Sequence, residues 1–317
     1  MKEQQKKYEL TDEFIEHWSG KKLYRIRALV AFGFVMAGQL GGFVESEKNL
    51  DQSLSGNAWV YGDTQVYGDA QVYGDAWVYG NAQVSGNAQV SGDAQVYGNA
   101  QVSGNAQVSG NAWVYGNAQV SGDTQVSGNA QVSGDAQVYG NAQVSGNAQV
   151  SGNAWVYGDA QVYGNAQVYG DAWVYGNAQV SGNAQVSGNA QVSGDAWVYG
   201  DAWVYGNAWV YGNAQVYGNA QVYGDAQVYG DAWVRSYAVI SERKMIFGAT
   251  NVGSENGTLT VFNGKDGLIV TRGCFTGTVD NFLAKSAEVH DDKTKNEYKL
   301  LIEVAKSRIL GVKDERN

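Results

Sequence analysis

The central part of the chain repeats one pattern of apolar and polar positions every six residues. From residue 56 to residue 235 the unit reads Gly, Asn or Asp, Ala, Gln or Trp, Val, Ser or Tyr, and it occurs 30 times, with Thr in place of Ala at 64 and 124 and Arg in the last position at 235. Ala and Val are two positions apart, so on an extended backbone they point to one side and their neighbours point to the other. Gly-Asn and Gly-Asp pairs are typical of tight turns. Each unit therefore predicts one very short strand followed by one corner.

Three such units close into a triangular coil of 18 residues, in which Val and Ala fill the interior and the backbone bonds to the coils above and below. We therefore predict an all-β solenoid, a parallel β-helix of about ten coils over residues 56–235. A disordered, amyloid-forming repeat is the weaker alternative, because Gln, Asn and Tyr are abundant but a buried column of Val favours a fold.

The open ends of a solenoid carry unpaired backbone groups and need caps. The flanks are not repetitive, and we expect an N-terminal β cap over residues 1–55, with irregular first coils at 20–54, and a C-terminal α+β cap over 236–317. The C-terminal cap is expected to contain strands at 244–250, 257–263 and 268–272, a turn at 263–267 between the last two, and helices at about 278–290 and 295–310. Thr278 is the expected N-cap of the first helix.

The composition narrows the classes of function. The chain has 317 residues, one Cys, two His, no Pro and a net charge of −10. One Cys excludes a disulfide framework, and the acidic balance argues against direct binding of nucleic acid or of an acidic membrane surface. The longest uncharged run outside the repeat, 28–44, has 17 residues and four glycines, whereas a membrane helix needs about 20 mostly apolar residues. No secretory signal is visible, so we expect neither export nor a membrane span.

The six-residue unit resembles the repeat of the left-handed hexapeptide β-helices, the superfamily that includes the trimeric acyltransferases, throughout residues 56–235. The flanking string LYRIRALVAFGFVMAGQLGGFVESEKNL, and GCFTGTVDNF followed by EVAKSRI, are similar to the ends of a group of hexapeptide-repeat proteins encoded by bacteriophages and prophages. The resemblance implies a left-handed coil, with a right-handed one as the alternative, and a place in the host cytoplasm or in a virion. The chain departs from the charged residues expected in the N-terminal cap at Val30, Phe34, Met36 and Gln39.

The repeat lacks the side chains that the enzymes of this superfamily use. Its acyltransferases place a general-base histidine on a coil, and the related carbonic anhydrases hold zinc with three coil histidines. Here the coils contain no His, Cys, Lys or Glu, while His17 and His290 fall in the caps and Cys274 has no His nearby in the sequence. The corner aspartates have no fixed ligand spacing and suit turns. We therefore expect no enzyme, no catalytic residue, no metal and no cofactor.

The outward positions of the coils are acidic and aromatic. The coils carry 12 Asp and no Lys or Arg through residue 234, so mimicry of DNA toward a host protein is one alternative. Trp and Tyr recur at spacings that stack them on consecutive coils. The candidate aromatic ligand surface is Trp59, Tyr61, Trp77, Tyr79, Tyr97 and Tyr115. Exposed rings beside Gln and Asn could bind glycans or form a protein interface. The alternative interpretation is that the rings only stabilise the sheets through cross-strand pairs.

The uncharged run in the N-terminal cap indicates an association surface. Val30, Phe34 and Met36 share one parity, so an extended backbone puts them on one side, where they are a candidate interface between copies. The alternative is that the run folds under the cap. We therefore expect a non-enzymatic solenoid structural or binding protein that acts through protein contacts or self-association. A carbohydrate-binding or virion-associated adhesin is the second hypothesis, and an acyltransferase, which needs a coil histidine, is the third.

Overall fold

The structure is a computed structural model that describes residues 5–311. The parts of the two predicted caps at residues 1–4 and 312–317 lie outside the described residues. The chain divides into two compact units, Met1–Asn165 and Ala166–Asn317. Each unit contains solenoid turns and one cap, and each is described by itself.

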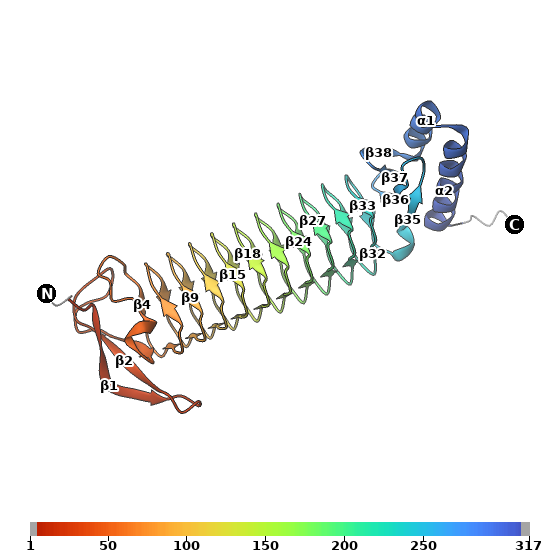
Figure 1. The fold of residues 1–317 in the computed structure, drawn as a ribbon. Coiled ribbons are helices and arrows are strands. Elements are labelled where there is room, and N and C mark those ends of the chain that lie inside the picture. Colours follow the sequence, from red (N-terminus) through yellow and green to blue (C-terminus); the bar gives the residue numbers. More distant parts are fainter. Residues whose placement is uncertain (1–4, 312–317) are drawn as a thin grey trace. The chain divides into compact units, whose positions relative to one another are not determined.

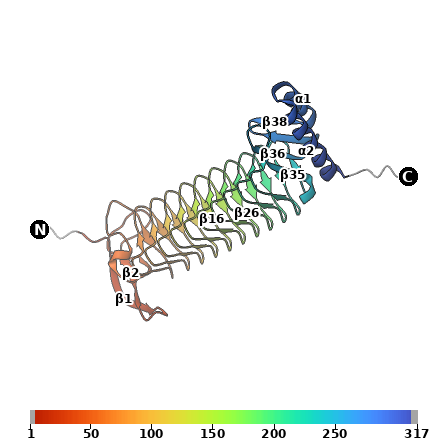
Figure 2. The same cartoon turned by 45° about the vertical axis from the view of Figure 1, so that its right-hand side comes forward.

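The repeat forms the predicted parallel solenoid in both units. Between residues 59 and 240 the chain forms 31 strands of two residues, from β4 (Trp59–Val60) at six-residue intervals to β34 (Val239–Ile240). Each strand pairs in parallel with the strand three further along, as β10 (Gln95–Val96) pairs with β13 (Trp113–Val114). Three strands make one turn of 18 residues, and the predicted fold of about ten turns is confirmed (Figures 1 and 2). The hand of the coil stays a prediction.

The interior of each turn contains the residues that the alternation places there. The Ala and Val columns are buried, with Ala130 and Val132 completely inaccessible to solvent. Removing these side chains from water is the main stabilising contribution of the turns. Thr124, which replaces an Ala, is also buried, and its hydroxyl donates to the carbonyl of Ser121 at 2.6 Å. A polar atom is therefore tolerated inside because it finds an acceptor on its own turn.

Backbone hydrogen bonds join each turn to the next at the strands and at the corners. The N–H of Gln83 donates to Ala100 O at 2.9 Å, and the N–H of Asn87 donates to Gly104 O at 2.7 Å. In these two bonds the donor belongs to the earlier turn, and the parallel pairing of β8 (Gln83–Val84) with β11 (Gln101–Val102) adds the bonds of the strand ladder. The first and last turns have no neighbouring turn on one side, so the caps must supply partners for their outward backbone groups.

The N-terminal cap is built from strands that the sequence analysis assigned only in part. The cap contains β1 (Tyr8–Glu16), β2 (Lys22–Ala28), β3 (Leu40–Val44) and the 3₁₀ helix η1 (Glu47–Asn49). β1 and β2 form an antiparallel hairpin, β2 pairs antiparallel with β3, and β3 pairs in parallel with β5 (Gln65–Val66) (Figure 1). The expectation of irregular coils over 20–54 is therefore wrong for β2. β1 was missed because most of its residues are exposed or half-buried, which hides the alternation that marks a strand.

Cationic and amide donors of this cap meet the carbonyl oxygens of the first turns. Lys7 Nζ donates to Gly56 O at 3.1 Å, and Arg25 Nη1 donates to Gly62 O at 3.3 Å. The side-chain amide of Asn49 donates to two further carbonyls, at 3.0 and 2.9 Å. Lys7 is fully buried, and this desolvation lowers the pKa of its ammonium group, although nearby aspartates raise it. The cap satisfies oxygens that would otherwise be buried without a donor.

The C-terminal cap belongs to the second unit and confirms most of the predicted elements. Its elements are η2 (Arg243–Met245), β35 (Ile246–Val252), β36 (Gly257–Gly264), β37 (Gly267–Arg272), β38 (Phe275–Thr278), α1 (Val279–Val289) and α2 (Asp292–Leu310). The four strands form one antiparallel sheet, and the turn between β36 and β37 lies at the predicted position. β38 was not predicted because it is only four residues long and half-buried.

Side-chain caps fix where the two helices begin. The N–H of Asn281 donates to Thr278 Oγ1 at 3.2 Å, as expected for the first helix. The N–H of Thr294 donates to Asp291 Oδ1 at 2.8 Å, so α2 begins earlier than the predicted 295. Phe282 of α1 and Tyr298 and Ile302 of α2 belong to one buried cluster with Val261 and Val270 of the sheet. Among residues 5–311, no helix is long and apolar enough to cross a membrane.

Candidate functional site

A tight turn in the N-terminal cap places an aromatic ring outside the first turns of the solenoid. Phe32 and Val35 exchange two backbone hydrogen bonds of 3.0 and 2.8 Å, and Gly33 between them has a φ of 48°. The run is therefore a turn, and the shared parity assumed for an extended strand is wrong. Phe34 at the tip is nevertheless 81% exposed and Met36 is 70% exposed, whereas Val30 is half-buried. Two of the three candidate interface residues lie on the surface.

Phe34 overhangs the aromatic side chains of the first turns. Its ring meets Trp77 edge to face, with centroids 5.6 Å apart and an interplanar angle of 87°. Tyr61 and Tyr79 complete an open, apolar groove of about 730 Å³, which we call the Phe34 groove. This juxtaposition was not predicted, because nothing in the repeat indicates where the cap turn folds. Aromatic grooves of this kind bury apolar or cationic ligand groups.

A polar hollow of about 350 Å³ adjoins the Phe34 groove and shares Phe34 and Trp77 with it. Its polar walls come from Asn57, Asp75, Asp93 and Gln95. Asn57 contributes both its N–H and its side-chain amide to Asp75 Oδ1, at 2.9 and 2.8 Å. The groove thus continues from an aromatic floor onto an acidic corner of the solenoid.

The predicted aromatic columns exist but present mainly ring edges. Tyr79 and Tyr97 stack with centroids 4.7 Å apart and 3° between planes, and Tyr97 and Tyr115 stack at 4.9 Å. Each stacked ring covers a face of its neighbour, so little aromatic face is left for a sugar ring. Burial raises the pKa of the Tyr79 and Tyr97 phenols. This column therefore supports the sheet as cross-strand pairs do.

Trp59 does not belong to the exposed surface that the alternation predicts. Its side chain is fully buried, with the rings of Tyr8 and Phe32 packed against it at 6.1 and 5.4 Å. The prediction of an exposed Trp59 is wrong because the cap folds over the first turn and covers it. Other tryptophans are 37 to 46% exposed: Trp113, Trp173, Trp197, Trp203 and Trp209.

The one cysteine and the two histidines lie in the caps. His17 is nearly buried, with its Nδ1 2.8 Å from Ser19 Oγ and its ring tilted by 42° against that of Tyr67, with centroids 4.4 Å apart. In the second unit, His290 Nδ1 lies 3.2 Å from Ser286 Oγ beside a hollow of about 480 Å³ that the exposed Cys274 also lines. Among residues 5–311, no three His, Cys, Asp or Glu side chains are grouped so as to hold a metal ion.

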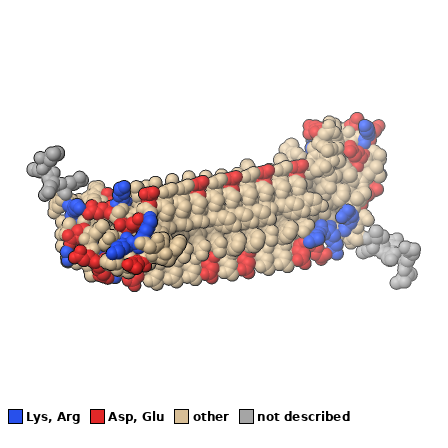
Figure 3. All heavy atoms as spheres, turned by 60° about the horizontal axis from the view of Figure 1, so that its bottom comes forward, with Lys and Arg blue, Asp and Glu red and all other residues tan. Residues whose placement is uncertain are grey.

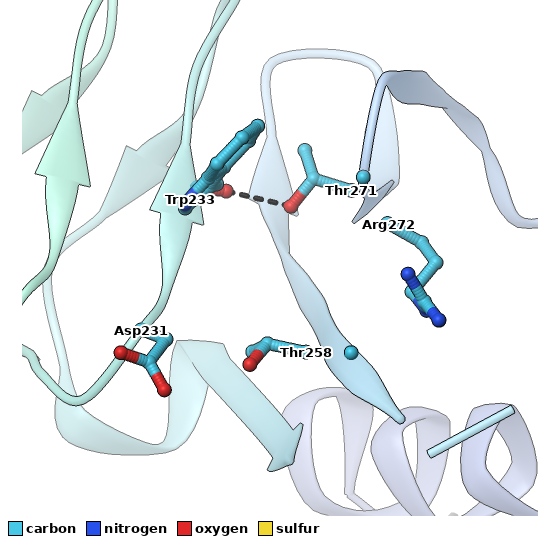
Figure 4. A pocket seen from close by; sticks show the side chains of 7 residues that line it. Asp231, Trp233, Thr258, Thr271 and Arg272 are labelled. Carbon is cyan, nitrogen blue, oxygen red and sulfur yellow. Dashed lines mark hydrogen bonds between the residues drawn. The ribbon is translucent and has the colours of Figure 1, made fainter. Parts of the chain in front are cut away.

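The hollow between the last solenoid turn and the C-terminal sheet is a structural junction. Asp231, Trp233, Thr258, Thr271 and Arg272 line a space of about 240 Å³ (Figure 4). Thr271 Oγ1 donates to Trp233 O at 2.7 Å, the dashed line in Figure 4. The N–H of Trp233 donates in turn to the hydroxyl of Thr260, on β36, at 3.3 Å. Two threonine hydroxyls thus pair with the backbone N–H and carbonyl of Trp233.

Comparison with known families identifies the repeat. The model of the YdcK beta solenoid repeat matches the chain in overlapping copies that cover residues 70–122 and 142–236. Each copy begins at the same position of the six-residue unit and spans almost one turn of the solenoid. A search of curated proteins finds no match. The chain is therefore a repeat β-solenoid protein whose turns are similar to the YdcK solenoid repeat.

Proposed function

We propose that this chain is a non-enzymatic solenoid binding protein, of phage or prophage origin, that acts through protein–protein contacts or self-association at its N-terminal cap. The observation that carries the proposal is the exposure of Phe34 and Met36 on a turn anchored to buried residues. Large apolar side chains held out by a rigid turn are unusual on a surface without a partner. Such residues form the central contacts of protein interfaces.

The geometry of the turn supports an interface rather than a loosely packed cap. Phe32 and Val35, on either side of the tip, are buried, and Phe32 packs on Trp59. Phe34 therefore projects from a fixed base, which limits the conformational entropy lost on binding. Both histidines lie in the caps, so the solenoid turns carry no imidazole base, in keeping with a binding role for the solenoid.

Light scattering on a double variant tests this function. Phe34→Glu with Met36→Lys exchanges two exposed residues, so it should leave the fold intact and abolish association. We expect the wild type to be oligomeric at micromolar concentration, or to retain a specific partner from host lysate, and the double variant to do neither. Tyr237→Glu with Val289→Lys makes the same kind of change on exposed residues of the C-terminal cap and should behave as wild type. A wild type that is monomeric and retains no partner that the double variant loses would exclude the proposed function.

Carbohydrate binding is a second candidate function, and one observation favours it. Trp203, which is 46% exposed, borders a hollow of about 260 Å³ with Tyr169, Gln185 and Tyr205. A tryptophan face beside an amide is the combination that holds a sugar ring. Glycan-array binding that is lost on Trp203→Gln, a residue the repeat itself uses at this position, would favour this function over protein contacts.

A further inference from the structure

Within residues 5–311, no Lys or Arg side chain lies over a ring of the Phe34 groove, although such cation–ring pairs occur elsewhere in the chain. Lys22 Nζ lies 4.0 Å above the ring of Phe14, and the Arg25 guanidinium lies 4.2 Å above that of Phe43. Between residues 56 and 234, in contrast, the sequence has no Lys or Arg. Figure 3 shows the consequence, with blue side chains gathered on the caps and only red ones on the repeat. Three of the four groove rings come from this cation-free segment.

The corner beside the groove carries an arrangement that occurs at no other corner of the repeat. Corner residues stack on the residue 18 positions later, and an aspartate normally follows an asparagine, as Asn105 Nδ2 donates to Asp123 Oδ1 at 2.7 Å. Asp93 instead follows Asp75, and these are the only two aspartates on consecutive turns of one column. The N–H of Asp75 donates to Gly92 O at 2.9 Å, which brings the two corners side by side. Neighbouring carboxylates repel each other unless a cation lies between them.

Both features meet at one place. The acidic hollow and the aromatic groove share Phe34 and Trp77, so a ligand on these rings lies next to Asp75 and Asp93. Ring faces and carboxylates both attract a cation, and the effects act together. An arginine or lysine side chain has a matching shape, with an apolar stem for the rings and a charged head for the carboxylates.

We propose that the Phe34 groove binds a cationic side chain, arginine or lysine, of a basic segment on a protein partner. This inference rests on the proposed function and names the chemistry of the partner. The stem of the side chain lies along Phe34 and Trp77, and the head group lies at Asp75 and Asp93. Charge complementarity favours this occupant over a neutral glycan, because sugar hydroxyls can donate hydrogen bonds to the carboxylates but bring no positive charge to offset their mutual repulsion.

Peptide binding to the full-length protein tests the inference. The probe is a fluorescein-labelled hexa-arginine peptide, compared with the same peptide in which neutral citrulline replaces each arginine. We expect the arginine peptide to bind more tightly and its affinity to fall with added salt. Asp75→Asn with Asp93→Asn should raise its Kd at least about tenfold. Trp77→Gln should weaken binding as well, and each of these changes introduces a residue that the repeat already uses.

Two matched variants control for net charge and for ring loss. Asp123→Asn with Asp135→Asn removes the same charge from corners that follow asparagines, and Trp113→Gln removes a ring from a later turn. Both should bind the arginine peptide like the wild type. Equal binding of the citrulline peptide, equal loss in the charge-control variant, or no binding by the wild type would each overturn the inference.

The outcomes also separate this inference from the proposed function. If the protein associates through Phe34 and Met36 but does not bind the arginine peptide, the proposed function stands and the proposal of a basic partner is refuted. Self-association that Trp77→Gln abolishes, by a wild type that does not bind the arginine peptide, puts a second copy in the groove and overturns the inference. Arginine-specific binding by a protein that neither self-associates nor retains a partner supports the groove chemistry and excludes the broader function.

Discussion

At the scale of single residues, the corner glycine meets two requirements at once. Gly104 has a φ of 69°, a conformation that other residues adopt only with strain. A Cβ on Gly104 would lie 2.7 Å from the backbone nitrogen of Gly122 on the next turn. The stacked backbones cannot separate without breaking the hydrogen bonds between turns. The recurrence of Gly at every sixth residue therefore follows from backbone geometry as well as from turn preference.

Two alanine substitutions separate these requirements. Gly230 has a similar φ of 64°, but nothing lies within 4 Å of the position its Cβ would take. Gly230→Ala should cost about 1–2 kcal/mol of unfolding free energy, which is the cost of the left-handed conformation alone. Gly104→Ala adds a clash with backbone and should cost at least about 2 kcal/mol more. Urea denaturation of both variants measures the difference, and equal costs would show that stacking of the corners contributes nothing.

At the scale of elements, the C-terminal cap is attached to the last turn by specific polar contacts. Thr271, on β37, is 1% exposed and donates its hydroxyl proton to Trp233 O. Nearby on β38, the hydroxyl of Thr276 is buried and has no hydrogen-bond partner among the described residues. Thr271 and Thr276 thus differ in that only the first has a hydrogen-bond partner for its hydroxyl among the described residues.

Valine, which has the shape of threonine, distinguishes the two sites. Thr271→Val leaves the buried carbonyl of Trp233 without a donor and should destabilise the cap by about 1–3 kcal/mol. Thr276→Val removes an unpaired hydroxyl and should leave stability unchanged or slightly higher. Hydrogen exchange of the β36 and β37 amides, measured with urea denaturation, reports the effect locally. A larger loss for Thr276→Val than for Thr271→Val would contradict this account of the junction.

The regular elements could be predicted from the sequence, whereas the candidate site could not. The six-residue unit determines strand, corner and interior locally, and Thr278 marks the start of α1, so short-range patterns sufficed there. The burial of Trp59 and the position of Phe34 depend instead on how the cap run folds over the first turns. Residues 28–44 have no apolar periodicity from which their fold could be predicted. The Asp75–Asp93 pair can be recognised in the sequence when corner residues are compared at intervals of 18. A search for a fixed ligand spacing among the aspartates does not find it, because the other aspartates follow no such spacing.

At the scale of the whole molecule, tyrosines couple stability to alkaline pH. Burial raises the pKa of a buried cap phenol, Tyr8, and of Tyr79, Tyr139 and Tyr199 on the turns. In the unfolded chain these groups titrate near pH 10. Above that pH the folded state therefore binds more protons than the unfolded state, and the free energy of unfolding falls as pH rises. The effect adds up over both units, since tyrosines with raised pKa occur in each.

A phenylalanine variant tests this coupling without removing a ring. Tyr97 stacks between Tyr79 and Tyr115, and its pKa is raised first by burial and then by these two neighbouring phenols. Tyr97→Phe keeps the stack and should match the wild type at pH 8. Above pH 10 its stability should fall less steeply, because each tyrosine contributes at most about 1.4 kcal/mol per pH unit to the slope. Urea denaturation at half-unit steps from pH 8 to pH 11 measures both slopes. Identical slopes would mean that Tyr97 ionises as readily in the folded state as in the unfolded chain, so that stacked burial does not protect its phenol.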